Sequence, residues 1–391
     1  MQHVASRDLL GLTACGHYRC GGGGPGGGGR PGGGGDFNVG QANGISKTNA
    51  LGLNYSNVYN KKLTLSGSYF YNNSVNNNQS IIKTETFLKP DTSLFTFQNS
   101  NSTTDNTNHR INMRLEYAID SSNSLFIIPS VNFQQNNSAS FSELKSYYGL
   151  PTAGNVYDSA SNSLSRINSN RNGYNLRNNI LFRHAFAKKG RSLALGFNTA
   201  FTKNDGENTS MGTYRYFGFS PLTDSIQNQF YNNISNGHTI GGNVTYTEPI
   251  TKTAIIQLEY NPSVQINKAN QETFSFDGQK YSKFDSSLSN KFNNRVTTNN
   301  AGLTYRYTPN KDVQLSFGAS YQNSKLESDR IFPSKTNVSQ SFSSVLPNFM
   351  FRKKLSVSSN IRVFYRTNVN FPSVTQLQDV VNLTNPLRVS T

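Results

Sequence analysis

The chain has 391 residues, of which 34% are hydrophobic and 12% aromatic, and its formal net charge is +16. It is too polar for one large soluble core of this length, and too aromatic for a disordered chain. No run of about 18 apolar residues occurs, so the sequence excludes a transmembrane helix.

The first 46 residues differ in composition and periodicity from the rest of the chain. Residues 1–20 contain both cysteines, Cys15 and Cys20, whose spacing does not fit a zinc site. The apolar stretch before Cys15 is short and interrupted by charges, so we predict no signal peptide and interpret residues 1–20 as an atypical, misassigned start. Residues 21–46 are Gly-rich without the flanking strand and helix of a phosphate-binding loop, which indicates a flexible loop.

From residue 47 to the end of the chain, six pairs of alternating apolar and polar stretches each flank a short polar turn. In the second pair, for example, Ile111 and Met113 alternate with Asn112. Stretches of about ten residues with a period of two, short turns at one end and long Asn- and Ser-rich loops at the other, are typical of membrane-spanning β-barrels. The pairs are residues 50–56 with 62–72, 110–119 with 125–134, 174–186 with 192–203, 238–250 with 254–267, 296–308 with 313–322, and 342–352 with 361–367.

These pairs predict an all-β fold over residues 47–391. We expect a transmembrane antiparallel β-barrel, here about 12 strands of a larger barrel, with short periplasmic turns and long extracellular loops. A soluble β-sandwich shows the same alternation, but strands of about ten residues are longer than the five or six usual in soluble sheets, which favours the barrel.

The alternation also predicts which side chains face lipid. A charge at the middle of the bilayer costs about 2–4 kcal/mol on the lipid face. We therefore expect the apolar parity of each strand to meet lipid and the other parity to line a water-filled lumen. The predicted lumen-facing charged residues are Arg110, Arg114, Glu116, Arg177, Arg183, Arg306 and Arg362.

No catalytic, cofactor or metal site can be assembled from the sequence. The five histidines are isolated from nucleophile or metal partners, and Glu116 and Glu259 lack an identifiable acid–base partner. Basic residues gather at the short turns, such as residues 352–354, and not in one tail, so we expect no nucleic-acid partner. We therefore predict that the chain is not an enzyme and binds no cofactor.

Two separated segments carry a family resemblance. The first comprises residues 43–55 and 67–72, and the second runs from residues 365–367 through 372–377 to 385–387. The first resembles the Bacteroidota-type outer-membrane β-barrel family, and the second is similar to a late-barrel motif of its relatives, the TonB-dependent receptors. The resemblance covers about residues 36–391. The motif positions are Arg366, Pro372, Ser373, Leu377, Asn385 and Pro386.

The resemblance implies an integral protein in the outer membrane of a Gram-negative bacterium, surrounded by outer-membrane lipid. It implies uptake of a nutrient ligand, coupled to the TonB system through a plug domain that is absent from this chain. The family continues with further strands after the motif that ends near Pro386. We therefore interpret the chain as a fragment that is incomplete at its C-terminus. The alternative is a plugless porin-like or adhesive surface barrel.

Overall fold

A computed structural model describes residues 43–89, 92–149, 158–217 and 223–369, and these form one antiparallel sheet without a helix. Twelve strands are paired in chain order, and the short β9 pairs with β8 outside that path. The strands are β1 (Ile45–Tyr59), β2 (Leu63–Lys89), β3 (Thr92–Ala118), β4 (Asn123–Gly149), β5 (Asp158–Ala185), β6 (Ser192–Tyr216), β7 (Thr223–Pro249), β8 (Ala254–Phe276), β9 (Tyr281–Phe284), β10 (Asn290–Tyr307), β11 (Val313–Phe332), β12 (Thr336–Lys354) and β13 (Asn360–Arg366).

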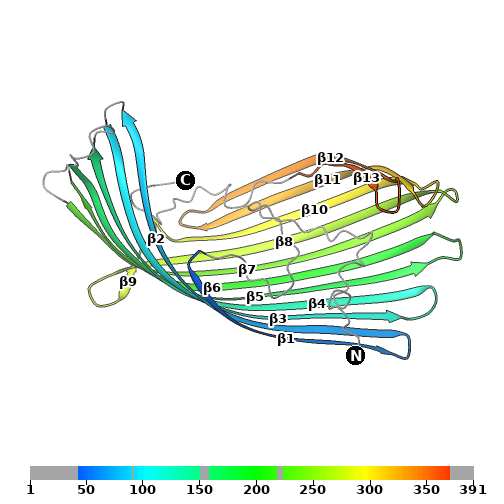
Figure 1. The fold of residues 1–391 in the computed structure, drawn as a ribbon, viewed down its shortest axis with the longest axis horizontal. Helices are drawn as coiled ribbons and strands as arrows, with labels where there is room; N and C mark the ends of the chain where they lie inside the picture. The colour runs from blue at the N-terminus through cyan, green and yellow to red at the C-terminus, as the bar shows by residue number, and fades with distance from the viewer. Residues whose placement is uncertain (1–42, 90–91, 150–157, 218–222, 370–391) are drawn as a thin grey trace.

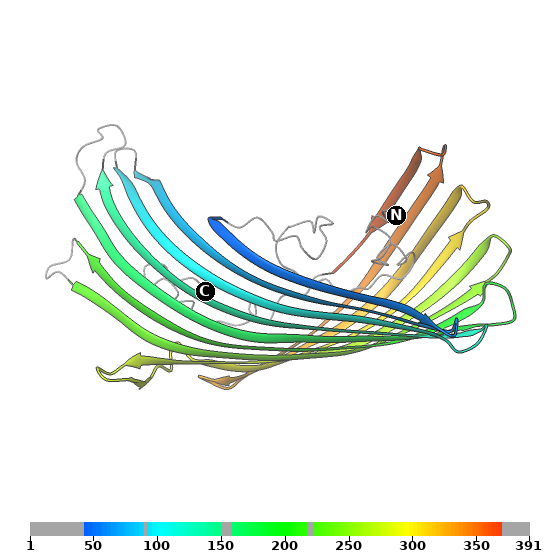
Figure 2. The ribbon, with the colours of Figure 1, turned by 60° about the horizontal axis from the view of Figure 1, so that its bottom comes forward.

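The sheet is an open curved wall. Figures 1 and 2 show long strands bent together into a trough, with β1 and β13 at its two free edges. Among the described strands, β1 pairs with β2 alone and β13 with β12 alone, so the wall does not close on itself. The predicted all-β antiparallel architecture is confirmed. β1 begins two residues before the predicted start of the barrel region, and residues 1–20 lie outside the described part.

Polar side chains fix the short turns. Asp120 Oδ1 accepts hydrogen bonds from the backbone N–H groups of Ser122 and Asn123, at 2.7 and 2.8 Å. Asn310 Oδ1 does the same for Asp312 and Val313, both at 3.0 Å. These side chains replace the backbone partners that a turn lacks, which is why Asp and Asn are favoured there.

The segments expected as long loops are largely strand. Residues 73–89 fall in β2 and residues 92–109 in β3, and these strands have 27 residues each. Polar side chains continue the pairing across them: Asn73 Nδ2 donates to Asp105 Oδ1 at 2.7 Å, and Thr103 Oγ1 donates to Asn77 Oδ1 at 2.8 Å. Because the backbone ladder itself needs no apolar side chains, a polar hairpin can extend well beyond a hydrophobic strand pair.

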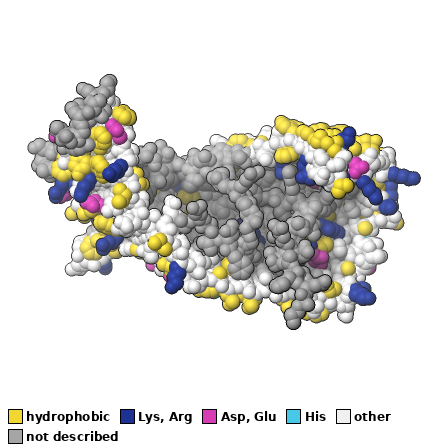
Figure 3. Space-filling model, in the orientation of Figure 1, with side chains coloured by type: hydrophobic (Ala, Val, Ile, Leu, Met, Phe, Trp, Pro, Cys, Tyr) yellow, Lys and Arg dark blue, Asp and Glu magenta, His cyan; other side chains and the backbone are white. Residues whose placement is uncertain are grey.

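The register gives the sheet two faces of different chemistry. Leu258 lies opposite Leu303, and Leu303 lies opposite Ala319. We call this parity the apolar face, because its large apolar side chains are exposed; Leu258, Leu303 and Phe317 are each 50% exposed. Figure 3 shows hydrophobic side chains gathered along the upper right border of the view, where β12 lies in Figure 1. The opposite parity, with Gln257, Thr304 and Ser316, is called the polar face. So much exposed apolar surface indicates contact with lipid.

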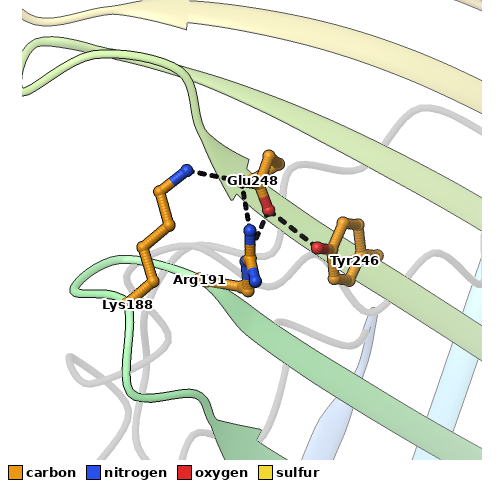
Figure 4. A network of polar contacts seen from close by, with 4 residues as sticks. All are labelled: Lys188, Arg191, Tyr246 and Glu248. Carbon is orange, nitrogen blue, oxygen red and sulfur yellow. Dashed lines mark hydrogen bonds and ion pairs between the residues drawn. The ribbon is translucent and has the colours of Figure 1, made fainter.

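A partly exposed charge network joins two neighbouring hairpins at the short turns (Figure 4). Glu248, near the end of β7, accepts hydrogen bonds from Arg191 Nε and Nη2 at 2.7 and 2.8 Å. It also accepts them from Lys188 Nζ at 2.6 Å and the Tyr246 hydroxyl at 2.7 Å. Lys188 and Arg191 flank the turn between β5 and β6. The hydrogen bonds from Arg191, followed by those from Lys188 and Tyr246, hold the pKa of the Glu248 carboxyl far below its usual range.

This network predicts a pH-dependent contribution to stability. A lowered folded-state pKa stabilises the fold above the carboxyl's unfolded pKa, and this contribution is lost as pH falls through the folded-state value. We expect Glu248→Gln to lower the urea midpoint in lipid vesicles at pH 7. The difference from the unmodified protein should shrink below about pH 4, where the unfolded carboxyl becomes protonated.

Lys189→Gln is the matched control, because it removes a charge from the same turn and the structure shows no bond from Lys189 to Glu248. It should leave the midpoint nearly unchanged. Equal midpoints for Glu248→Gln and the unmodified protein at pH 7 would show that the network adds no stability.

Candidate functional site: the polar face at the apolar band

All seven predicted charged residues lie on the polar face. The register places Arg177 opposite Ser130 and Ala200. It places Arg306 opposite Ile255 and Ser316. The seven belong to β3, β5, β10 and β13, and each has the parity opposite to the apolar face of its strand.

Three of these charged residues, Arg114, Glu116 and Arg183, converge with Phe126 near the short turns. The Phe126 ring on β4 has the Arg183 guanidinium carbon 4.8 Å from its centroid and the Arg114 guanidinium carbon 5.9 Å from it. Arg114 also forms an ion pair with Glu116 on the same strand. A cation over an aromatic face is attracted by the ring quadrupole. Phe126 therefore holds two arginines from neighbouring strands on the same face.

The alternating pattern alone did not identify Phe126. It occurs in the apolar run Leu125, Phe126, Ile127 and Ile128, in which alternation does not show which residues face lipid. The signal in the sequence was the break in alternation itself: a large apolar residue on the polar parity, which the register places diagonal to arginines on the strands beside it.

The last two strands carry more arginines on this face. Arg362 of β13 lies directly opposite Arg352 of β12, and both are exposed. Arg366 lies opposite Asn348 on the same face. The remaining motif residues, Pro372, Ser373, Leu377, Asn385 and Pro386, lie outside the described residues.

Aromatic rings mark the limits of the apolar face. Far from the short turns, Tyr71 and His109 have ring centroids 5.0 Å apart, and Phe201 and His238 have centroids 6.4 Å apart. Beside the turns, Phe186 lies 4.5 Å from His184 and 6.4 Å from Tyr246. The far row across β2 to β7 consists of Tyr71, His109, Phe133, Tyr174, Phe201 and His238.

The part of the sheet between the two aromatic rows, called the apolar band, is about ten residues wide along each strand, which is the length a tilted strand needs to cross a bilayer. Just beyond the far row the same parity carries polar side chains, such as those of Asn77, Thr103 and Asn137. Aromatic girdles on both sides of an apolar belt are characteristic of barrels in lipid. Only the part of each strand nearest its short turn therefore has a lipid-facing surface.

The described residues contain neither a membrane-spanning helix nor a cluster of metal ligands. No helix there has the length and apolar character required to cross a membrane. No three His, Cys, Asp or Glu side chains in that part of the chain come together in a way that could hold a metal ion.

Solved outer-membrane proteins show a weak structural likeness to the chain. The outer membrane protease OmpT from Escherichia coli matches with 9% identity and a TM-score of 0.22, covering 82% of this chain and 96% of that one. The alcaligin outer membrane receptor FauA from Bordetella pertussis matches with 9% identity and a TM-score of 0.15, covering 82% of this chain and 71% of that one. No curated protein matches.

The likeness to OmpT corrects one prediction. The chain was predicted not to be an enzyme, and a protease now stands among the solved structures that are similar to it. The absence of a catalytic pattern in the sequence does not exclude an activity. At a TM-score of 0.22 the likeness equally assigns no proteolysis to this chain.

The family comparison gives a firmer result. The model of the outer membrane protein beta-barrel family matches residues 184–391, which is more than half of the chain. The matched region runs from the end of β5 through every later strand. It agrees with the antiparallel sheet and with the apolar band described above. The chain belongs to the outer membrane protein beta-barrel family.

Proposed function

We propose that the chain forms the barrel wall of a protein that carries a nutrient ligand across the outer membrane, in the manner of a TonB-dependent receptor. The observation that carries the proposal is that, within the apolar band, the two faces of the sheet have opposite chemistry. The apolar face there is bounded by aromatic rows, and the polar face behind it carries arginines such as Arg177 and Arg306. A strand that faces lipid on one side must place its charged parity toward water on the other.

The receptor assignment is supported by the late-barrel resemblance that begins at residues 365–367. It requires three kinds of partner: outer-membrane lipid around the apolar face, a nutrient ligand on the polar face, and the TonB energy-coupling system acting through a plug domain.

A porin-like or adhesive surface barrel is the second candidate, and the strand lengths favour it. β4 and β7 each have 27 residues, so well over half of each strand lies beyond the apolar band. These extensions expose Asn, Ser and Thr side chains outside the membrane, where they could contact a surface or a glycan.

Growth under nutrient limitation separates the two functions. We expect a strain lacking the protein to grow more slowly than its parent in at least one medium where a single nutrient limits growth, and complementation to restore growth. Growth rates should be measured across media limited in turn by iron chelates, peptides and glycans. Equal growth in every medium, together with weaker attachment to surfaces, would support the adhesive barrel instead.

The lipid-facing parity gives a second prediction. Leu258→Arg and Leu303→Arg place a charge on the apolar face and should each destabilise the folded protein in lipid by about 2–4 kcal/mol near the middle of the bilayer. Gln257→Arg and Thr304→Arg are matched controls on the adjacent positions of the same strands, and they should be tolerated. Unfolding by urea in vesicles measures the difference, and equal sensitivity of the two sets would contradict the assignment of faces.

Labelling of single cysteines tests the orientation in the membrane. In a form with Cys15 and Cys20 replaced by serine, cysteines at Lys189 and Lys311, in exposed short turns, should react with an impermeant thiol reagent only after the outer membrane is breached. Cysteines at the exposed Asn77 and Asn337, at the other end of the strands, should react on intact cells. The reverse pattern would place the short turns outside the cell.

A further inference from the structure

Positive charge is concentrated on the polar face of the sheet, in the part that lies between the two aromatic rows. Arginines there greatly outnumber acids. Among the described residues, the acids on this part of the polar face are Glu116 and Glu259. Arg352 and Arg366 share the face with the predicted arginines. Those predicted arginines are Arg110, Arg114, Arg177, Arg183, Arg306 and Arg362.

Several charges elsewhere on the sheet lie in ion pairs. Beyond the apolar band, Lys145 Nζ lies 2.7 Å from Glu143 Oε1, and Lys325 Nζ lies 2.5 Å from Glu327 Oε1. Arg215 makes a bidentate pair with Asp224, with both bonds at 2.7 Å. Among the described residues of the polar face at the level of the membrane, by contrast, only two acids accompany the arginines, so this face has a local excess of cations.

The geometry of Arg306, Arg352 and Arg362 suits a ligand more than a structural role. The buried Nε of Arg306 has no hydrogen-bond partner among the described residues. Arg352 and Arg362 lie directly opposite each other, although like charges at paired positions destabilise a sheet. A fold that keeps such groups without acids beside them incurs a cost that an anion on the polar face would offset.

We propose that the ligand carried along this face is a small anion, a solute that bears carboxylate, phosphate or sulfate groups. This inference rests on the proposed passage of a ligand along the polar face. The planar guanidinium donates two parallel hydrogen bonds to such groups, which is why arginine is favoured for recognising them. Low-dielectric walls lined by one sign of charge also concentrate counter-ions along their surface.

Ion selectivity tests the charge of the face. The protein is reconstituted in planar bilayers of zwitterionic lipid, and the reversal potential is measured across a KCl gradient. We expect preference for chloride, and a fall of about threefold or more in the chloride-to-potassium permeability ratio for the double variant Arg177→Gln, Arg306→Gln. The double variant Arg177→Lys, Arg306→Lys keeps the charge and should retain most of the preference. Arg295→Gln is the matched control, because Arg295 is exposed on the other parity, beyond the apolar band.

A binding measurement separates this inference from the proposed function. A trisulfonated naphthalene dye and its uncharged analogue are titrated onto the same lipid-embedded protein. We expect saturable binding of the sulfonated dye that weakens in the Gln double variant and not in Arg295→Gln. Dye binding without any effect of the protein on growth would overturn the passage of a nutrient and leave the anion site standing. Cation preference, or equal binding of the two dyes, would overturn the anion site whatever the result for passage.

Discussion

The pairing of backbone groups in lipid is the constraint on which the rest of this structure depends. Hydrocarbon offers no partner for an N–H or C=O group, so a chain that crosses the membrane as strands must satisfy each group from the next strand. The twelve-strand path of the sheet does this with one uninterrupted antiparallel order. Because successive side chains of a strand point to opposite faces, the hydrogen-bonded sheet has two faces whatever its sequence. The sequence determines which side chains lie on each face.

That chemistry changes along the strand as well as across it. Within the apolar band, Leu258 and Leu303 pair on one face while Arg306 stands on the other. Beyond it, Asn73, Thr103 and Asp105 join neighbouring strands through side-chain hydrogen bonds on a face that was apolar a few residues earlier. Each pair of strands thus has lipid on one face and water on the other within the apolar band, and water on both faces beyond it.

The sequence was sufficient for the strand order, the short turns and the division into faces, because these depend on local alternation and on turn residues such as Asp120 and Asn310. Alternation did not reveal the long polar hairpins, since the backbone pairing that forms β2 and β3 beyond Tyr71 leaves no apolar pattern. Nor did it reveal contacts between strands, such as those of Phe126 with two arginines or of Glu248 with the neighbouring turn. Contacts of this kind depend on register, which is a property of pairs of strands.

The free edges of the wall have a consequence for how it enters a membrane. Each edge, β1 and β13, presents backbone groups that no described neighbour pairs, and in hydrocarbon each such group costs several kcal/mol. The cost is repeated along an edge and is removed only when another strand pairs with it. Insertion into lipid and completion of the ring are consequently one thermodynamic event, and a partly inserted wall attracts any compatible strand to its margins.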